Sequence, residues 1–396
     1  MKKYLAWPVA LATLGLTALS VVPAEAAPGP VTSVPTQAAA STAEEPGSLL
    51  EQARAMLGPE IVATATANAQ RLGLEEAPAS TAAILKAIDP EDYACSPNTP
   101  LTDWVAGTIT DWTVLDRIFA LGATLSNLAG YGSMIATPAN SPYGLNGEFT
   151  TAVTHTFRDV KTFWDIQSGD IEIKPMHSAV LADRTALYQV FRTIYNRSDF
   201  DSTFFANLYA GWAEQPKFRN HPLLSMNAYA FTGAGDPNPA LAALPDQIVM
   251  GDGIMQAYQA IGLGDVAPQA ILSHEFGHHV QYEDGLFASD LTGPEATRRT
   301  ELMADGFGAY FLSHSRGASM QWKRVRLFDQ VFYGIGDCNF SDPGHHGTPN
   351  QRLRTVEWAY SVVTGAPNQG HILPSLTFAG LFDAKLPDLV APDAGS

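Results

Sequence analysis

The stretch "ILSHEFGHHV", Ile271 to Val280, decides how this sequence is interpreted. It holds the spacing His-Glu-x-x-His, from His274 to His278, inside a segment predicted to be helical from Pro268 to Tyr282. Residues four apart lie one above the other on a helix, so both imidazoles can converge on one metal ion. Glu275 lies about 100° around the helix from His274, where its carboxylate can reach a water on that ion. The alternative is two histidines on a polar helix face.

The neighbours of the two histidines favour the metal site. The other side of the helix is predicted to be buried, because it carries the apolar residues Leu272, Phe276 and Val280. Gly277 costs about 1 kcal/mol relative to Ala inside a helix, so it indicates close packing or a function. Asp265 and Pro268 predict the helix start, as a capping oxygen and a first-turn proline. His279 is predicted to point away from the ion and to be structural.

A catalytic zinc site needs a third protein ligand, and the next predicted helix offers one. That helix begins at Gly293-Pro294 and continues "EATRRTELMADGFGAYFL". Glu301 and Asp305 lie four apart on one face, and small residues beside them, Ala304 and Gly308, would let this helix approach the histidine helix closely. We expect Glu301 to be the third ligand and Asp305 to hydrogen-bond the far nitrogen of a ligand histidine. A solvated acidic face is the alternative.

Three segments in order, "HEFGHHVQ", "ELMADGFGAYF" and "HGTPNQR" (His346 to Arg352), resemble the neutral zinc metallopeptidase family and, more broadly, the gluzincins. The resemblance covers roughly residues 225–365. It implies that His274, His278 and Glu301 bind Zn²⁺ and that Glu275 is the general base of a peptidase. Gly306 stands where the family often has Cys.

Two further segments acquire a role from this resemblance. "MNAYAF" resembles the edge strand that gluzincins lay beside their substrate, where Asn227 and backbone groups near Ala228 would hold an extended peptide. An ordinary core strand is the alternative. The run from Thr348 to Gln351 fits a capping box with proline at the first helical position, which places His346 just before a helix. On the family pattern, His346 would donate a hydrogen bond to the developing oxyanion; the alternative is a structural role.

Charge and the first residues limit the classes of function. The chain has 396 residues and a net charge of −17 without a basic run, which argues against nucleic acid and anionic membrane surfaces as partners. Lys2, Lys3, an apolar run and Ala24-Glu25-Ala26 predict a signal peptide over residues 1–26. We therefore expect a secreted, periplasmic or cell-surface protein, without stable membrane insertion once the signal is removed. In an exported chain, Cys95 and Cys338 are predicted to form a disulfide, with two buried thiols as the alternative.

The rest of the chain divides into three predicted regions. Residues 27–48 are rich in Ala, Pro, Ser and Thr and are predicted to be a flexible linker. Residues 49–200 are predicted to be mainly helical, as a pro-region, a substrate-binding domain or part of a larger fold. Within them, residues 147–164 and 170–176 alternate like strands. Residues 201–385 are predicted to be an α+β, zincin-like metallopeptidase domain, in which a short sheet packs on the two active-site helices.

The function that these features predict is that of an exported zinc-dependent metallopeptidase acting on a peptide or protein substrate. Zinc is expected because two histidines and one carboxylate are the ligands of many catalytic zinc sites. Two alternatives stay open, namely a non-catalytic exported metal-binding surface protein and a metal hydrolase acting on cell-wall peptides. The sequence gives no indication of the oligomeric state.

Overall fold

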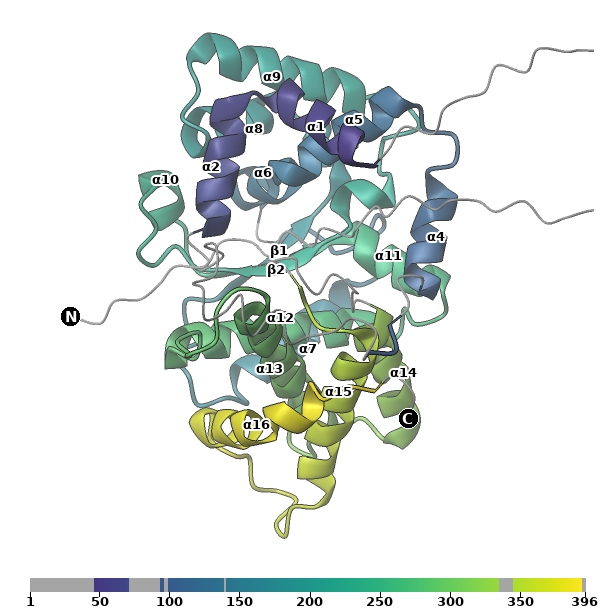
Figure 1. Cartoon of the computed structure of the whole chain (residues 1–396), viewed down its shortest axis with the longest axis vertical. Helices are drawn as coiled ribbons and strands as arrows, with labels where there is room; N and C mark the ends of the chain where they lie inside the picture. The colour runs from purple at the N-terminus through teal and green to yellow at the C-terminus, as the bar shows by residue number, and fades with distance from the viewer. Residues whose placement is uncertain (1–45, 71–92, 96–98, 139, 335–344, 394–396) are drawn as a thin grey trace, which may run out of the picture.

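The structure is a computed structural model, and it describes residues 46–70, 93–95, 99–138, 140–334 and 345–393 (Figure 1). Helices dominate the described residues, and one small mixed sheet lies between an upper and a lower group of helices. This arrangement agrees with the predicted α+β class. The predicted signal peptide, most of the predicted linker and Cys338 lie outside the described residues.

The sheet has three strands in the order β1-β3-β2. β1 (Glu172–Met176) pairs parallel to β3 (Gln247–Gly251), and β2 (Ala228–Phe231) pairs antiparallel to β3. Every residue of β3 is buried, which is typical of a central strand covered on both faces. The strand order makes β2 one edge of the sheet. This edge strand was predicted to include Asn227, but it begins one residue later, at Ala228.

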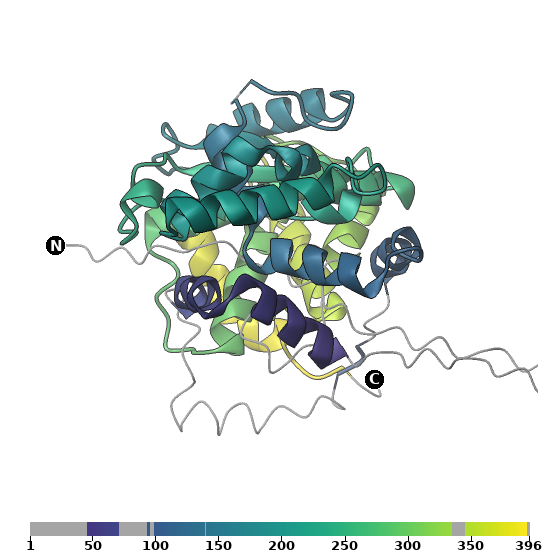
Figure 2. The same ribbon diagram turned by 90° about the horizontal axis from the view of Figure 1, so that it is seen from above.

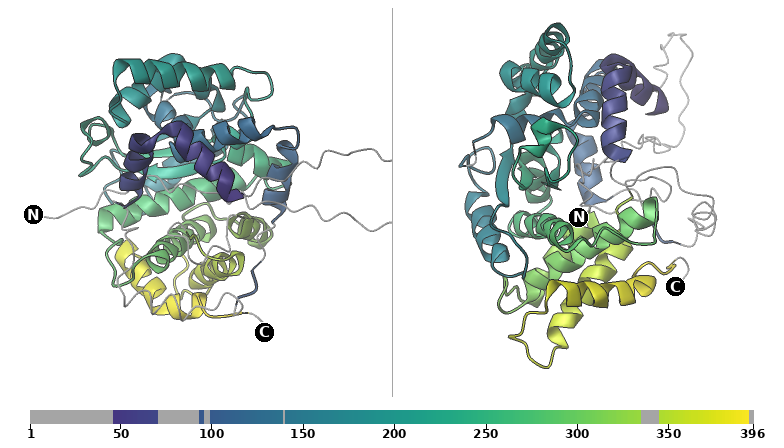
Figure 3. Two further views of the ribbon diagram at one scale, coloured as in Figure 1. Left: turned by 45° about the horizontal axis from the view of Figure 1, so that its top comes forward. Right: turned by 90° about the vertical axis from the view of Figure 1, so that its left-hand side faces the viewer.

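Two hydrophobic cores lie on the two faces of the sheet. Successive side chains of a strand point to opposite faces. Accordingly, Ile248 and Met250 of β3 belong to the lower core, while Val249 belongs to the upper core. The side view in Figure 3 shows the chain from green to yellow gathered below the sheet.

The upper group contains the N-terminal helices, and seen from above α1 and α2 lie along one side of it (Figure 2). Its helices, among them the 3₁₀ helices η2 and η4 and the π-helix η3, are α1 (Pro46–Leu57), α2 (Pro59–Gln70), α5 (Val114–Leu125), α6 (Leu128–Ala136), η2 (Ser178–Ala182), α8 (Arg184–Gln189), η3 (Val190–Ile194), α9 (Asp199–Ala213), η4 (Pro222–Ser225) and α10 (Pro239–Ala242). The flanking and lower helices are α4 (Pro100–Thr108), α7 (Thr150–Lys161), α11 (Asp252–Ala260), α12 (Ala267–Asp284), α13 (Pro294–Ser313), α14 (Trp322–Gly334), α15 (Pro349–Thr364) and α16 (Ser375–Leu389).

Two sequence predictions change in the structure. Residues 147–164 do not form a strand, because most of them form helix α7, whose buried residues Val153, Thr156 and Val160 recur every three to four positions. The predicted strand in residues 170–176 is confirmed as β1. Helix α1 begins at Pro46, inside the segment predicted as a linker.

Residue 200 is not a boundary of the sheet or of the core. β1 lies in the 49–200 region and pairs with β3 in the region after it. The lower core likewise joins Leu101 and Val153 to residues of α12 and α13. The helices that carry the predicted metal ligands are therefore packed against the N-terminal region.

Among the described residues, no single helix is long and apolar enough to cross a membrane. Only α5 and α6, taken together across a bend of 53°, meet that test by length and composition.

Candidate metal centre

Helix α12 carries the His-Glu-x-x-His spacing through the middle of the lower core. Every residue from Ala270 to Gln281 is buried, so this helix is covered all round. It begins at Ala267, with Val266 rather than the predicted Asp265 at the N-cap. Asp265 instead lies 3.5 Å from Arg324. The alternative, in which the two histidines lie on a polar surface of the helix, is excluded by this burial.

Small residues bring α12 and α13 into close contact. A Cβ at Gly277 would lie 2.9 Å from the backbone oxygen of Ala304 and 3.0 Å from its Cα. A Cβ at Gly308 would lie 3.1 Å from the backbone nitrogen of His274. The predicted close approach of the two helices is confirmed, and its tightest point is beside the histidines.

This contact brings both histidines to the carboxylate of Glu301. His274 Nε2 is 3.4 Å from Glu301 Oε2, and His278 Nε2 is 3.5 Å from Glu301 Oε1. Both distances lie near the upper limit for N–H···O hydrogen bonds. They match the spacing of about 3.3–3.4 Å between two ligands of a tetrahedral zinc ion with bonds of about 2.0–2.1 Å. Each histidine thus faces a different oxygen of the Glu301 carboxylate, at a separation similar to that between two ligands of one ion.

Glu275 belongs to the same buried cluster. Ligand atoms of His274, Glu275 and His278 all lie within 4.8 Å of one another, and this group could hold a metal ion. Glu301 faces both Nε2 atoms, whereas the Glu275 carboxylate accepts a hydrogen bond from the backbone N–H of Ala230 in β2. The cluster thus has two carboxylates, of which Glu275 is the one held toward the sheet.

Hydrogen bonds fix the orientation of both imidazole rings. His274 Nδ1 lies 2.8 Å from Asp305 Oδ1, which also accepts a hydrogen bond from Arg352 Nη2 at 2.5 Å. His278 Nδ1 lies 2.9 Å from Gln281 Oε1, and Gln281 Nε2 donates to a backbone oxygen of α13 at 2.7 Å. With Nδ1 donating in each ring, both Nε2 atoms are left for the ion.

Sequence analysis assigned no role to Gln281 or Arg352. Gln281 follows His278 by three positions, so helical spacing could have identified it. Arg352 lies 47 residues from Asp305, and no spacing links the two. The predicted contact between Asp305 and a ligand histidine is present in the structure.

Burial affects the two histidines differently. Burial opposes a charge on His274, but hydrogen bonds to Asp305 and Glu301 outweigh it and raise its pKa to about 10. For His278, burial dominates and lowers the pKa to about 4, although Glu301 opposes this shift. Without metal, one proton is thus held on His274 against Glu301, at the place where the ion would sit.

The two carboxylates also differ. Burial raises the pKa of Glu275 to about 7, while the charge of His274 opposes the rise. Burial alone would raise the pKa of Glu301, but His346, His278 and His274 hold it well below its usual range. Glu301 is therefore a permanent anion, whereas Glu275 can take up and release a proton near neutral pH.

The edge strand β2 exposes backbone groups next to Glu275. The backbone oxygen of Asn227 accepts the N–H of Gly251 at 2.9 Å, so Asn227 is a hydrogen-bonded member of the antiparallel ladder. Alternate residues of such a strand point their N–H and C=O groups the other way. Ala228 and Ala230 therefore direct theirs to the outer edge, where the N–H of Ala230 meets Glu275 and its C=O accepts the hydroxyl of Tyr282 at 3.4 Å.

The remaining predicted residues lie around this cluster. His279 is fully buried and its Nε2 lies 3.1 Å from the backbone oxygen of Gln247, so it ties α12 to β3 and does not face the ion. His346 is half-buried, just before α15, and lies close enough to Glu301 for its charge to lower the pKa of that carboxyl. The capping box predicted at Thr348 is confirmed. Cys95 is in a disulfide bond, and Cys338 lies outside the described residues.

The described residues therefore place two imidazoles, two carboxylates and the outer edge of β2 in one buried region. No family model matches the chain, and comparisons with curated proteins and with solved structures gave no match.

Proposed function

We propose that the protein is an exported zinc-dependent peptidase whose metal ligands are His274, His278 and Glu301. The observation that carries the proposal is the pair of separations of 3.4 and 3.5 Å between Glu301 and the two Nε2 atoms. Two imidazoles and one carboxylate leave a fourth position open, as in catalytic zinc sites. The order of the three sequence segments, which resembles the neutral zinc metallopeptidase family, supports the same assignment.

Glu275 is the proposed general base. When bound, the metal would act as a Lewis acid that polarises the scissile carbonyl and lowers the pKa of a water molecule. Glu275 removes the proton from the attacking water and delivers it to the nitrogen of the leaving amine. A pKa of about 7 suits both transfers. His346, on the Glu301 side of the cluster, would donate a hydrogen bond to the developing oxyanion.

The proposed substrate is a peptide in extended conformation. Ala228 offers its N–H and C=O at the free edge of the sheet, two residues before the N–H that holds Glu275. A peptide that adds to this edge as a further strand would bring one of its carbonyls to the cluster. The edge thus supports a peptide bond as the target, in proteins or in cell-wall peptides.

One observation favours a second candidate, a closed structural metal site. Glu275 lies within the same 4.8 Å group as both histidines, so it could serve as a fourth protein ligand. Structural zinc sites use four protein ligands and no open position. The two candidates differ in what Glu275 does, and this difference can be measured.

The test combines metal content and hydrolysis. We would measure zinc per chain by elemental analysis for the wild type, Glu301→Ala, Glu275→Gln and the exposed control Glu357→Ala. The proposal expects one zinc in the wild type, in the control and in Glu275→Gln, and little in Glu301→Ala. Chelator-sensitive cleavage of linear peptides or purified wall material should be lost in Glu275→Gln. A wild type that takes up no zinc refutes the proposal, and loss of zinc from Glu275→Gln with no cleavage by the wild type supports the closed site.

A further inference from the structure

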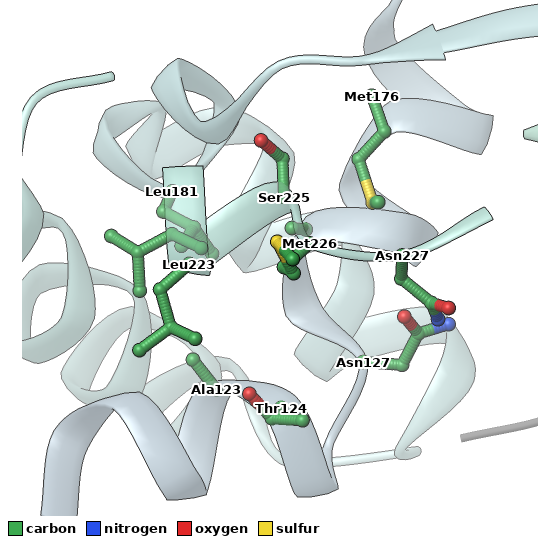
Figure 4. A pocket seen from close by; sticks show the side chains of 11 residues that line it. Ala123, Thr124, Asn127, Met176, Leu181, Leu223, Ser225, Met226 and Asn227 are labelled. Carbon is green, nitrogen blue, oxygen red and sulfur yellow. The ribbon is translucent and has the colours of Figure 1, made fainter. Parts of the chain in front are cut away.

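The two ends of the small sheet have different surroundings. Where β1 ends and β2 begins, the sheet borders a small cavity lined by uncharged residues, Met176 and Asn227 among them (Figure 4). At the opposite end, Asp170 lies two positions before β1 and Asp246 one position before β3. The starts of these parallel strands are side by side, because the N–H of Glu172 donates to the backbone oxygen of Asp246 at 2.8 Å. Two acidic residues therefore belong to this end of the sheet.

Helix α12 adds a histidine and a third acidic residue at the same end. His279 and Glu283 are four residues apart, so both lie on one face of the helix. That face is about 100° around the helix from His278, a proposed zinc ligand. Burial raises the pKa of Glu283, and the charges of Asp170 and Asp246 add to the rise, so these carboxylates are near neighbours. One imidazole and three carboxylates thus gather outside the first cluster.

One buried nitrogen of this group makes no hydrogen bond. His279 is fully buried, and its Nε2 must donate to the backbone oxygen of Gln247, at 3.1 Å, because a carbonyl oxygen can only accept. A neutral imidazole has one donor and one acceptor nitrogen, so Nδ1 then carries a lone pair. Within the part of the chain that the structure describes, Nδ1 has no hydrogen-bond partner, and it lies 3.5 Å from Asp246 Oδ2. A lone pair that faces a carboxylate oxygen in a buried place is unfavourable unless a positive group lies between the two.

The spacing of these two atoms is similar to that between two ligands of one metal ion. It matches the separations of 3.4 and 3.5 Å between Glu301 and the two histidines of the first cluster. A proton on Nδ1 would instead favour a directed hydrogen bond to the carboxylate, at about 2.7–2.9 Å. The Asp246 side chain is 14% exposed and Asp170 is exposed, so an ion can reach this place from solvent.

The types of side chain limit the kind of ion. Carboxylate oxygens suit Mg²⁺, Ca²⁺ and Mn²⁺, whereas imidazole nitrogen suits transition-metal ions. Ca²⁺ takes six to eight oxygen ligands, so a buried nitrogen among the ligands argues against it. Mn²⁺ satisfies both conditions. Because the group is open to solvent at Asp170, its ion should exchange readily and be lost when excess metal is removed.

We propose that His279, Asp246 and Glu283 form a second metal site, which binds one exchangeable divalent ion of the Mn²⁺ type. Asp170 closes its outer side. His279 and Asp246 are already at ligand spacing, and the half-buried Glu283 reaches the ion by a change of side-chain rotamer. The ion would tie α12 to the start of β3, next to the proposed zinc ligand His278. This site does not depend on the peptidase function.

The test is a titration of the zinc-loaded protein with Mn²⁺, in which EPR spectroscopy measures the free aqua ion. We expect one bound Mn²⁺ per chain. Asp246→Asn and Glu283→Gln keep the shape of the side chain and remove its charge, so each should weaken binding about tenfold or more. Asp103→Asn, at an exposed position of α4, makes the same change of charge and is the matched control, which should bind Mn²⁺ like the wild type.

Glu301→Ala separates the two metal sites. This variant should lose zinc and still bind one Mn²⁺ with the affinity of the wild type, because Glu301 is not part of the second site. If Glu301→Ala abolishes Mn²⁺ binding, the ion binds at the first cluster and the second site is refuted. A failure of the peptidase proposal would leave the titration unchanged, because it measures no hydrolysis.

Pulsed EPR of the bound Mn²⁺ identifies the nitrogen ligand. Coupling to a nitrogen nucleus is expected from His279 Nδ1 and should disappear in His279→Gln. The wild-type spectrum decides the question even if that variant does not fold. No bound Mn²⁺, no nitrogen coupling, or wild-type affinity in Asp246→Asn would each overturn the site and leave His279 as an ion-pair partner of Asp246. Displacement of the bound Mn²⁺ by an equal concentration of Ca²⁺ would also contradict it.

Discussion

The contact between α12 and α13 predicts a specific effect of Gly277→Ala. The added Cβ would lie 2.9 Å from the backbone oxygen of Ala304, whereas ordinary van der Waals contact begins at 3.4 Å. The two atoms nearest to this Cβ, the oxygen and the Cα of Ala304, belong to the backbone, so they cannot rotate away. The difference between the two distances requires α13 to move by about 0.5 Å, because atoms inside a protein are already closely packed.

This movement changes both stability and zinc binding. Overpacking of a core costs about 1–3 kcal/mol, while replacing Gly by Ala in a helix recovers about 1 kcal/mol. The free energy of unfolding should therefore fall by about 0–2 kcal/mol. Because α13 carries Glu301, the separations of 3.4 and 3.5 Å would widen beyond the tolerance of about 0.2 Å for ligand bonds. We expect zinc affinity to fall about tenfold or more.

Two measurements check this prediction. Zinc affinity is measured by competition with a chromophoric chelator, and stability by denaturant unfolding of the metal-free protein. The control is Gly380→Ala, in the middle of α16, where a Cβ meets no atom within 4 Å. It should gain up to about 1 kcal/mol and bind zinc normally. If Gly277→Ala gains the same stability and keeps its zinc affinity, the α12–α13 contact does not set the ligand spacing.

Three further changes test other parts of the structure. Glu275→Gln should retain zinc and lose about 10²–10⁴ in kcat, and wild-type turnover would remove the assignment of the general base. Asp305→Asn should lower zinc affinity by about 10–100-fold in the same competition assay, because His274 loses its charged partner; an unchanged affinity would contradict that role. Burial, reinforced by Glu357, raises the pKa of Asp329 to about 7, so the folded protein retains a proton that the unfolded chain releases above about pH 4. The free energy of unfolding should thus fall by roughly 2–4 kcal/mol as pH rises from about 4 through 7. In denaturant titrations, Asp329→Asn should make the free energy of unfolding depend less on pH. If the variant depends on pH as steeply as the wild type, Asp329 is not the cause.

Periodicity and spacing predicted the parts of the site that lie on single elements. The helix through His274 and His278 and the next helix with Glu301 both follow from local sequence. The error at residues 147–164 has a local cause as well. β-branched residues in this segment suggested the alternating pattern of a strand. The segment is a helix instead, because one face of α7 packs on α12.

Contacts between distant elements could not be predicted from the sequence. Arg352 donates a hydrogen bond to Asp305, which is 47 residues away in the sequence, and neither segment has a sequence pattern that predicts this contact. The N–H of Ala230 that holds Glu275 is a backbone group, so no residue type signals it. The pairing of β1 with β3 is equally non-local, which is why residue 200 looked like a boundary.

The order of elements along the chain has a consequence for folding. His274 and Glu301 are 27 residues apart (301 − 274), whereas Glu172 of β1 pairs with Gln247 of β3 across 75 residues (247 − 172). Contacts between residues that are close in the sequence form faster than contacts between residues far apart in it. We therefore expect the α12–α13 hairpin to form before the sheet. An incompletely folded chain would then have the cluster around His274 without the strand edge proposed to hold a peptide. In the proposed peptidase, such an order would keep newly made molecules from cleaving one another until the whole fold is complete.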